Sequence, residues 1–231
     1  MERSFKSLTH YGLGAIDGEI GKICDVYVDG ATWHICYWIV DTGTLLDQRK
    51  VMIAAHSVLG IECRNKTFET SLSRNQIKDS PVIDTNKAES NQQEIISDHF
   101  RNYWFLPIKH GVLLDKEANR GISNINLRSL EVLLSCKIYG TDSYLGRVID
   151  YILDTKYWKI DYLIIEIGGL FRSQKVLIPI KLINTINWTV LVININMAKK
   201  EFGQLQCYDP QGRVNILSDG SFLDYHGRPA S

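Results

Sequence analysis

An internal repeat constrains this chain more than any other feature of its sequence. Residues 17–58 align with residues 142–183 at a constant offset of 125 and without a gap. Thirteen of the 42 aligned pairs are identical, including Trp33 with Trp158. Identity at a fixed period indicates a repeated structural unit. The sequence therefore predicts two domains of similar fold within its 231 residues.

Charge is balanced along the chain. It contains 26 basic and 26 acidic residues, and the sequence pI is about 7.0. A protein that binds by neutralising nucleic-acid phosphates would carry a basic excess, and so would one that binds anionic lipid through a polybasic patch. We therefore expect neither nucleic acid nor a membrane as partner.

The cysteines give no framework for disulfides or zinc. They are odd in number and contain no CxxC pair: Cys24, Cys36, Cys63, Cys136 and Cys207. Free thiols in a reducing compartment are the simpler interpretation. The start of the chain has no apolar core typical of a signal peptide, and its longest apolar runs are too short to span a bilayer. These features predict a cytoplasmic protein without membrane insertion.

Alternating side chains predict short strands in both copies. In the first strand, Cys24, Val26 and Val28 are expected to face the core, while Asp25 and Asp29 occupy a solvated face. In the second strand, the following residues and their aligned partners are expected to point inward: Ile35, Tyr37, Ile39, Ile160, Tyr162 and Ile164.

Further strands are expected in each copy, at residues 50–53 and 67–72 and at residues 175–178 and 189–196. Phe5–Leu8 is predicted to lead into the first copy as Leu127–Leu130 leads into the second, with a three-residue change in spacing. Short helices are expected at Arg74–Lys78 and Glu94–Phe100.

The predicted fold is mainly β, with two small antiparallel barrels, short helices and a linker. The predicted boundaries are a first barrel at 1–84, a short helix and linker at 85–125, a second barrel at 126–200 and a tail at 201–231.

The repeated pattern resembles the PRC-barrel family. The pattern is DGxxGxVxDxxxD, then WxIxYxI, then a glycine, then KVLIP, and it is closest in the second copy. The matching residues there are Gly146, Asp150, Trp158, Ile160, Tyr162 and Val176 to Pro179. In the first copy, Ala54 and Ala55 stand where the family has its proline region.

That family includes the cytoplasmic domain of the purple-bacterial reaction-centre H subunit and the C-terminal domain of the small-subunit ribosome maturation factor. The layout is similar to the bacterial tandem form, in which a short helix ending in an aromatic motif follows each barrel. The candidates for this motif are His99–Trp104 and Tyr225–Pro229. The resemblance implies small, strongly bent antiparallel barrels and an adaptor role, and it implies no shared active site.

No catalytic, metal or cofactor site is predicted from the residues. Asp17 and Glu19 with Asp25 and Asp29 lack the spacing of an EF-hand loop. The six histidines are scattered and are expected at the surface, and a pairing of Cys36 with His34 has no third group to orient it. We therefore expect a protein that is not an enzyme.

Two sets of apolar residues are candidates for interaction surfaces. Trp33 and Trp158 could stack on a ligand, but their recurrence favours core positions. The outer face of the second strand carries further apolar side chains, which another barrel or a partner chain should cover. These candidate interface residues are Trp38, Val40, Leu163 and Ile165.

The sequence thus predicts a non-enzymatic scaffold or protein–protein interaction protein. The expected partners are an unidentified protein and a second copy of the chain in a homodimer. An RNA- or ribosome-associated processing factor is the alternative, by analogy with the maturation factor. A small-ligand carrier that uses the cleft between the barrels is a third hypothesis.

Overall fold

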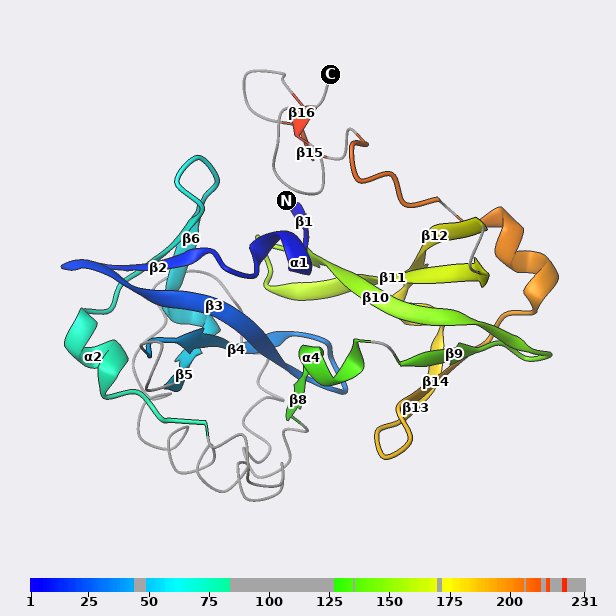
Figure 1. Cartoon of the computed structure of the whole chain (residues 1–231), viewed down its shortest axis with the longest axis horizontal. Helices are drawn as coiled ribbons and strands as arrows, with labels where there is room; N and C mark the ends of the chain where they lie inside the picture. Colours follow the sequence, from blue (N-terminus) through cyan, green and yellow to red (C-terminus); the bar gives the residue numbers. More distant parts are fainter. Residues whose placement is uncertain are drawn as a thin grey trace, which may run out of the picture.

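Two seven-stranded sheets lie side by side along the long axis of the molecule (Figure 1). The computed structural model describes residues 1–43, 49–83, 127–134, 136–169, 172–205, 207–212, 215–216 and 222–223. The predicted fold class is confirmed, because strands dominate these residues and the helices are short.

The first unit, residues 2–83, contains strands, two short α-helices and one 3₁₀ helix. In chain order they are β1 (Glu2–Ser4), α1 (Phe5–Leu8), β2 (Gly12–Ala15), β3 (Gly18–Asp29), β4 (Ile35–Asp41), β5 (Lys50–Ala54), η1 (Ala55–Ser57), β6 (Val58–Glu62), β7 (Thr67–Thr70) and α2 (Arg74–Lys78). The predicted helix at residues 74–78 is confirmed, and a capping box between Ser73 and Gln76 begins it.

The second unit, residues 127–208, repeats this order at the same offset of 125. Its elements are β8 (Leu127–Ser129), α4 (Leu130–Leu133), β9 (Lys137–Tyr139), β10 (Tyr144–Asp154), β11 (Lys159–Gly169), β12 (Arg172–Pro179), η3 (Ile180–Leu182), β13 (Ile183–Asn187), β14 (Val192–Ile195) and η4 (Lys199–Gln204). A separate pair, β15 (Asn215–Ile216) and β16 (Phe222–Leu223), follows.

The repeat extends beyond the aligned block in both directions. Val82 bridges to Val51 at the edge of β5, and Cys207, 125 residues later, bridges to Val176 at the edge of β12. The predicted boundary at residue 200 therefore falls inside η4. The predicted helix at residues 94–100 and both aromatic motifs lie outside the described residues.

The two sheets share one strand order, and as far as the described residues go, neither sheet is closed or purely antiparallel. The first runs β5-β4-β3-β2-β7-β6 and the second β12-β11-β10-β9-β14-β13. In each, one pair is parallel: β2 with β7 and β9 with β14. The ends of each path are joined by a 3₁₀ helix and share no ladder within the described residues. The predicted antiparallel barrels are thus open mixed sheets.

β-bulges change which residues face the core. The register of β3 against β4 shifts between Ile23 and Asp25 and again between Tyr27 and Val28, and β10 against β11 shifts at the aligned positions. Each bulge adds a residue on one strand and so reverses the alternation beyond it. Strict alternation failed here, because Cys24 lies on the opposite side from Val26 and Val28.

The prediction for the second strand was therefore wrong in its faces. Trp38 and Val40 lie with Ile35 in the main core, whereas Tyr37 and Ile39 lie in a small cluster on the other face. The aligned residues behave alike. Leu163, Ile165 and Ile160 are in the main core, Ile164 is in a separate small cluster, and Tyr162 packs against that cluster while only half-buried.

The lead-in segments also differ from the prediction, because their offset is 125 with no change in spacing. Arg3-Ser4 aligns with Arg128-Ser129, and α1 aligns with α4. We call Glu2–Leu8 the first arm and Leu127–Leu133 the second arm. Each arm is exchanged: β1 pairs with β10 of the second unit, and β8 pairs with β3 of the first. In Figure 1 the arms lie at the boundary between the two sheets.

Two glycines at aligned positions allow neighbouring strands to approach closely. An added Cβ at Gly21 would lie 2.4 Å from the carbonyl oxygen of Asp41, and one at Gly146 would lie 2.2 Å from that of Glu166. Both distances are far inside van der Waals contact with backbone. A side chain at either position must therefore move a strand.

We expect Gly146→Val to lower the free energy of unfolding by roughly 1–3 kcal/mol, the usual range for strain at a constrained backbone position. Denaturant unfolding measures this directly. Gly60→Val is the matched control, because a Cβ at Gly60 in β6 would meet nothing within 4 Å. Equal midpoints for the two variants would contradict the close-approach argument.

Candidate functional site at the junction of the two units

The four candidate interface residues are all completely buried within the chain. Trp38, Val40, Leu163 and Ile165 each have 0 % exposure and belong to one apolar core that spans both units. Trp38 also contacts the second unit directly, as its ring centroid lies 5.1 Å from that of Trp158. None of the four is accessible to a partner on the surface. The prediction that they form an interface therefore applies to the contact between the two units of one chain.

A reciprocal backbone pairing joins the units at the tips of two hairpins. The amide of Ile35 donates to the carbonyl of Trp158 at 2.7 Å, and the amide of Ile160 donates to the carbonyl of Trp33 at 3.0 Å. The four residues are related by the offset of 125. An approximate twofold axis therefore passes between these hairpins.

The two tryptophans at this axis have an uncommon backbone conformation. Trp33 has φ 62° and Trp158 has φ 49°. The left-handed region is costly for a bulky non-glycine residue and persists only where surrounding structure enforces it. Here the cross-unit hydrogen bonds use the carbonyls of these same residues. The two tryptophans therefore recur at the positions where the backbones of the two units are joined.

Aromatic rings fill the junction on the side of the first unit. Trp158 lies edge-on to Trp38 and is stacked with Phe68 at 6.3 Å and 22°. Trp158 thus inserts its ring against the core of the first unit. Trp33 is 6 % exposed, so the expectation of core positions fits Trp33 closely, while Trp158 is half-buried.

Two buried carboxylates hold the exchanged arms. Asp25 of β3 accepts from Ser129 Oγ at 2.5 Å and from the amide of Glu131 at 3.0 Å. Asp150 of β10 accepts in the same way from Ser4 Oγ and from the amide of Lys6. Each carboxylate therefore caps the first turn of a helix that belongs to the other unit. We call these two sets of contacts the clasps.

The solvated face predicted for Asp25 was wrong. Asp25 is 5 % exposed and its aligned partner Asp150 is 7 % exposed. Burial raises the pKa of Asp25 to about 6, although its hydrogen bonds from Ser129 and two backbone amides lower it. Burial likewise raises the pKa of Asp150. A buried carboxylate is stable only when hydrogen bonds compensate its lost hydration.

Sequence reasoning missed Ser4 and Ser129, the partners of these carboxylates. Both lie outside the aligned block of 42 pairs, and the lead-ins were matched three residues out of register. Extending the offset of 125 to the start of the chain would have placed Arg3-Ser4 over Arg128-Ser129. These two identities were the signal in the sequence that Ser4 and Ser129 have equivalent roles.

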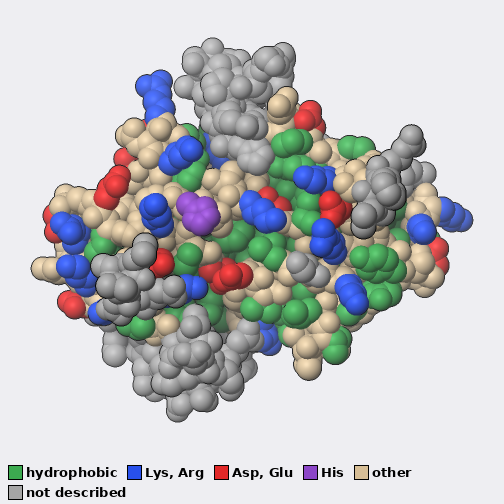
Figure 2. Space-filling view, in the orientation of Figure 1, with side chains coloured by type: hydrophobic (Ala, Val, Ile, Leu, Met, Phe, Trp, Pro, Cys, Tyr) green, Lys and Arg blue, Asp and Glu red, His purple; other side chains and the backbone are tan. Residues whose placement is uncertain are grey.

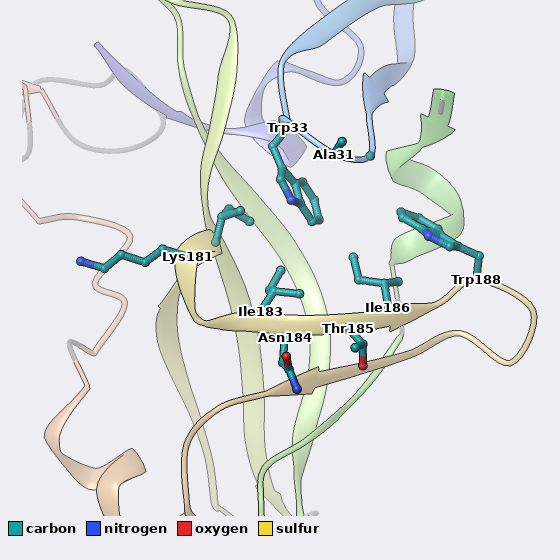
Figure 3. Close-up of a pocket in the computed structure, with 10 residues that line it drawn as sticks. Ala31, Trp33, Lys181, Ile183, Asn184, Thr185, Ile186 and Trp188 are labelled. Atoms are coloured by element: carbon teal, nitrogen blue, oxygen red, sulfur yellow. The ribbon is translucent and has the colours of Figure 1, made fainter. Parts of the chain in front are cut away.

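A surface pocket of about 390 Å³ lies between the units, bounded by the β3–β4 turn of the first and by β13 of the second. Figure 3 shows Trp33, Ile183 and Ile186 directed into it, whereas Asn184 and Thr185 point away. Specific ligand sites combine apolar walls with a few placed polar groups. Apolar side chains of Trp33, Ile183 and Ile186 line this pocket. The polar side chains of Asn184 and Thr185 on β13 do not converge on it, so the placed polar groups of a specific ligand site are missing from this strand.

The remaining surface offers little evidence of chemistry. Figure 2 shows basic and acidic side chains interspersed over one face, without a patch of a single sign. Among the described residues, no group of three or more His, Cys, Asp or Glu side chains is placed to hold a metal ion. Within the same residues, every helix is too short or too polar to cross a membrane.

Comparison with known families identifies one part of the chain. The model of the PRC-barrel domain matches residues 128–196. This span begins in the second arm and ends just after β14. No curated protein matches the chain.

Proposed function

Because this chain contains a PRC-barrel domain at residues 128–196, we propose that it is a non-enzymatic scaffold or protein-interaction protein. The match is the observation that carries the proposal, since this domain suggests an interaction module. The buried clasps support it, because Asp25 and Asp150, which recur at aligned positions, act in holding the arms across the junction.

We further propose that the first unit is a diverged second PRC-barrel domain. Its elements follow the order of the second unit at a constant offset, and its sheet has the same strand order. A single apolar core continues through both units, which supports their acting as one body. A scaffold of this kind would hold two outer surfaces at a fixed angle. We place it in the cytoplasm and expect a homodimer.

Affinity capture of the full tagged chain from its native cell, with protein and RNA both quantified, tests the proposal. We expect a protein partner in fixed molar ratio, with recovery that changes little between low and moderate salt. Light scattering should give a mass near twice 26.4 kDa. RNA recovered with a steep salt dependence would favour the processing-factor alternative, and the absence of any protein in fixed ratio would contradict a scaffold.

A further inference from the structure

The two arms share one pattern of contacts. Both read Arg-Ser, then Phe or Leu, then Leu three residues later, at Arg3–Leu8 and Arg128–Leu133. Each forms a short strand followed by one helical turn, and each lies on the unit to which it does not belong. Each unit is therefore built to receive an arm of this pattern.

The first arm lies along β10, and we call the part of β10 that contacts it, Asp150–Asp154, the groove. The groove makes several kinds of contact with the arm. Glu2 and Ser4 pair with Asp154 and Ile152 in the ladder, and Asp150 caps α1. The ring of Phe5 lies 6.3 Å from that of Tyr151, edge to face. Phe5 and Leu8 are 2 % and 0 % exposed. Backbone pairing, a polar cap and two apolar side chains together specify the arm.

A short and strained hinge connects this arm to its own unit. Only Thr9, His10 and Tyr11 separate α1 on the second unit from β2 in the first sheet. His10 has φ 74°, and its amide donates to the carbonyl of Ile23 at 2.8 Å. A non-glycine residue in this region stores strain, and short strained hinges favour exchange of a segment between copies.

We propose that the groove beside β10 is a docking site for the first arm of a second copy of this chain, so that two chains dimerise by exchanging residues 2–8. The contacts given above are made with groups outside the arm, so they form equally within one chain or between two. Concentration and the strain at His10 then decide between the two forms. The inference rests on the proposed interaction role and states how the second copy binds.

Mixing two defective full-length variants tests the exchange. Phe5→Asp damages the arm and leaves the groove intact, whereas Asp150→Ala damages the groove and leaves the arm intact. Neither variant alone can therefore combine an intact arm with an intact groove. In a mixture, the arm of the second fits the groove of the first, so we expect a heterodimer near twice 26.4 kDa by light scattering. Ile16→Asp introduces the same charge as Phe5→Asp at a position that is 71 % exposed and outside the arm, so this control should dimerise as the wild type does.

A hinge variant gives a second test that does not depend on a damaged arm. His10→Gly removes the strain of the closed chain, because glycine adopts positive φ readily. We expect the dissociation constant of the dimer to rise roughly fivefold to tenfold. Thr9→Gly is the matched control, since Thr9 has φ −61° and no such strain.

The outcomes separate this inference from the proposed function. A mixture that stays monomeric, or a His10→Gly chain whose dissociation constant equals that of Thr9→Gly, overturns arm exchange. If the wild type nevertheless dimerises, another surface joins the copies. Captured protein partners in fixed ratio would in either case leave the scaffold proposal standing.

Discussion

Replacing Trp38 and Leu163 together by serine is expected to lower the free energy of unfolding by roughly 5 kcal/mol or more, since a buried Trp or Leu truncation each costs about 2–5 kcal/mol. Both side chains have 0 % exposure and lie in the core that joins the two units. Trp38 also loses its contacts with Phe68 and Trp158. Such a loss is comparable with the whole stability of many domains.

Urea unfolding followed by tryptophan fluorescence and far-UV circular dichroism measures this effect. The wild type should unfold in one transition because one core spans both units, and the double variant should unfold at a much lower midpoint or in two steps. Ile16→Ser with Val190→Ser is the matched control, with one exposed apolar residue in each unit at 71 % and 62 % exposure. Equal midpoints for the two double variants would show that the Trp38 face does not join the units.

Removal of both clasps has the second-largest expected effect. In Asp25→Ala with Asp150→Ala, the hydroxyls of Ser129 and Ser4 and the amides of Glu131 and Lys6 lose their acceptor. Unmade hydrogen bonds of buried donors cost about 1–3 kcal/mol each, and relief of the buried charge offsets part of this. We expect a net loss of roughly 2 kcal/mol per site.

Asp25→Asn separates the charge of the carboxylate from its hydrogen bonds. The asparagine oxygen can accept from the amide of Glu131, and its amide group can donate to Ser129. The folded-state pKa of Asp25 is about 6, above its unfolded value near 3.8. The native state therefore binds the extra proton between these values, and the contribution of this group is fully present below about pH 4 and lost as pH rises through 6.

Stability measured from pH 4 to 8 should therefore fall with rising pH more steeply in the wild type than in Asp25→Asn. Comparing the two chains removes the contribution of the other carboxylates, which the variant retains. Parallel stability curves would mean that the Asp25 carboxyl titrates normally. If Asp25→Asn also proved as costly as Asp25→Ala, the capping contacts would depend on the charge itself.

The repeat made most of the strand positions predictable, because matching residues at one offset define the same elements twice. The faces were less predictable. Alternation assumes an unbroken ladder, and the bulges at Cys24 and Ile149 reverse it in both units. The parallel pairing of β2 with β7 also depends on how the sheet bends, which local periodicity does not record.

The junction was harder to predict for a different reason. An aspartate on a strand between apolar neighbours looks like a solvent-facing residue when its partners are unknown. The partners of Asp25 lie 104 and 106 residues away in the second arm. No local rule connects positions so far apart, and only the identity of Asp25 with Asp150 indicated that these carboxylates share a structural role.

The exchanged arms also set an order of events during synthesis. The acceptor edge of β3 at Tyr27–Asp29 is made early, but β8, which pairs with it, emerges about a hundred residues later. At translation rates of roughly 5–20 residues per second, that edge stays uncovered for several seconds on the ribosome. An uncovered strand edge can pair with other chains. The first unit therefore completes its sheet only after the second arm has been synthesised, although its own strands are made much earlier.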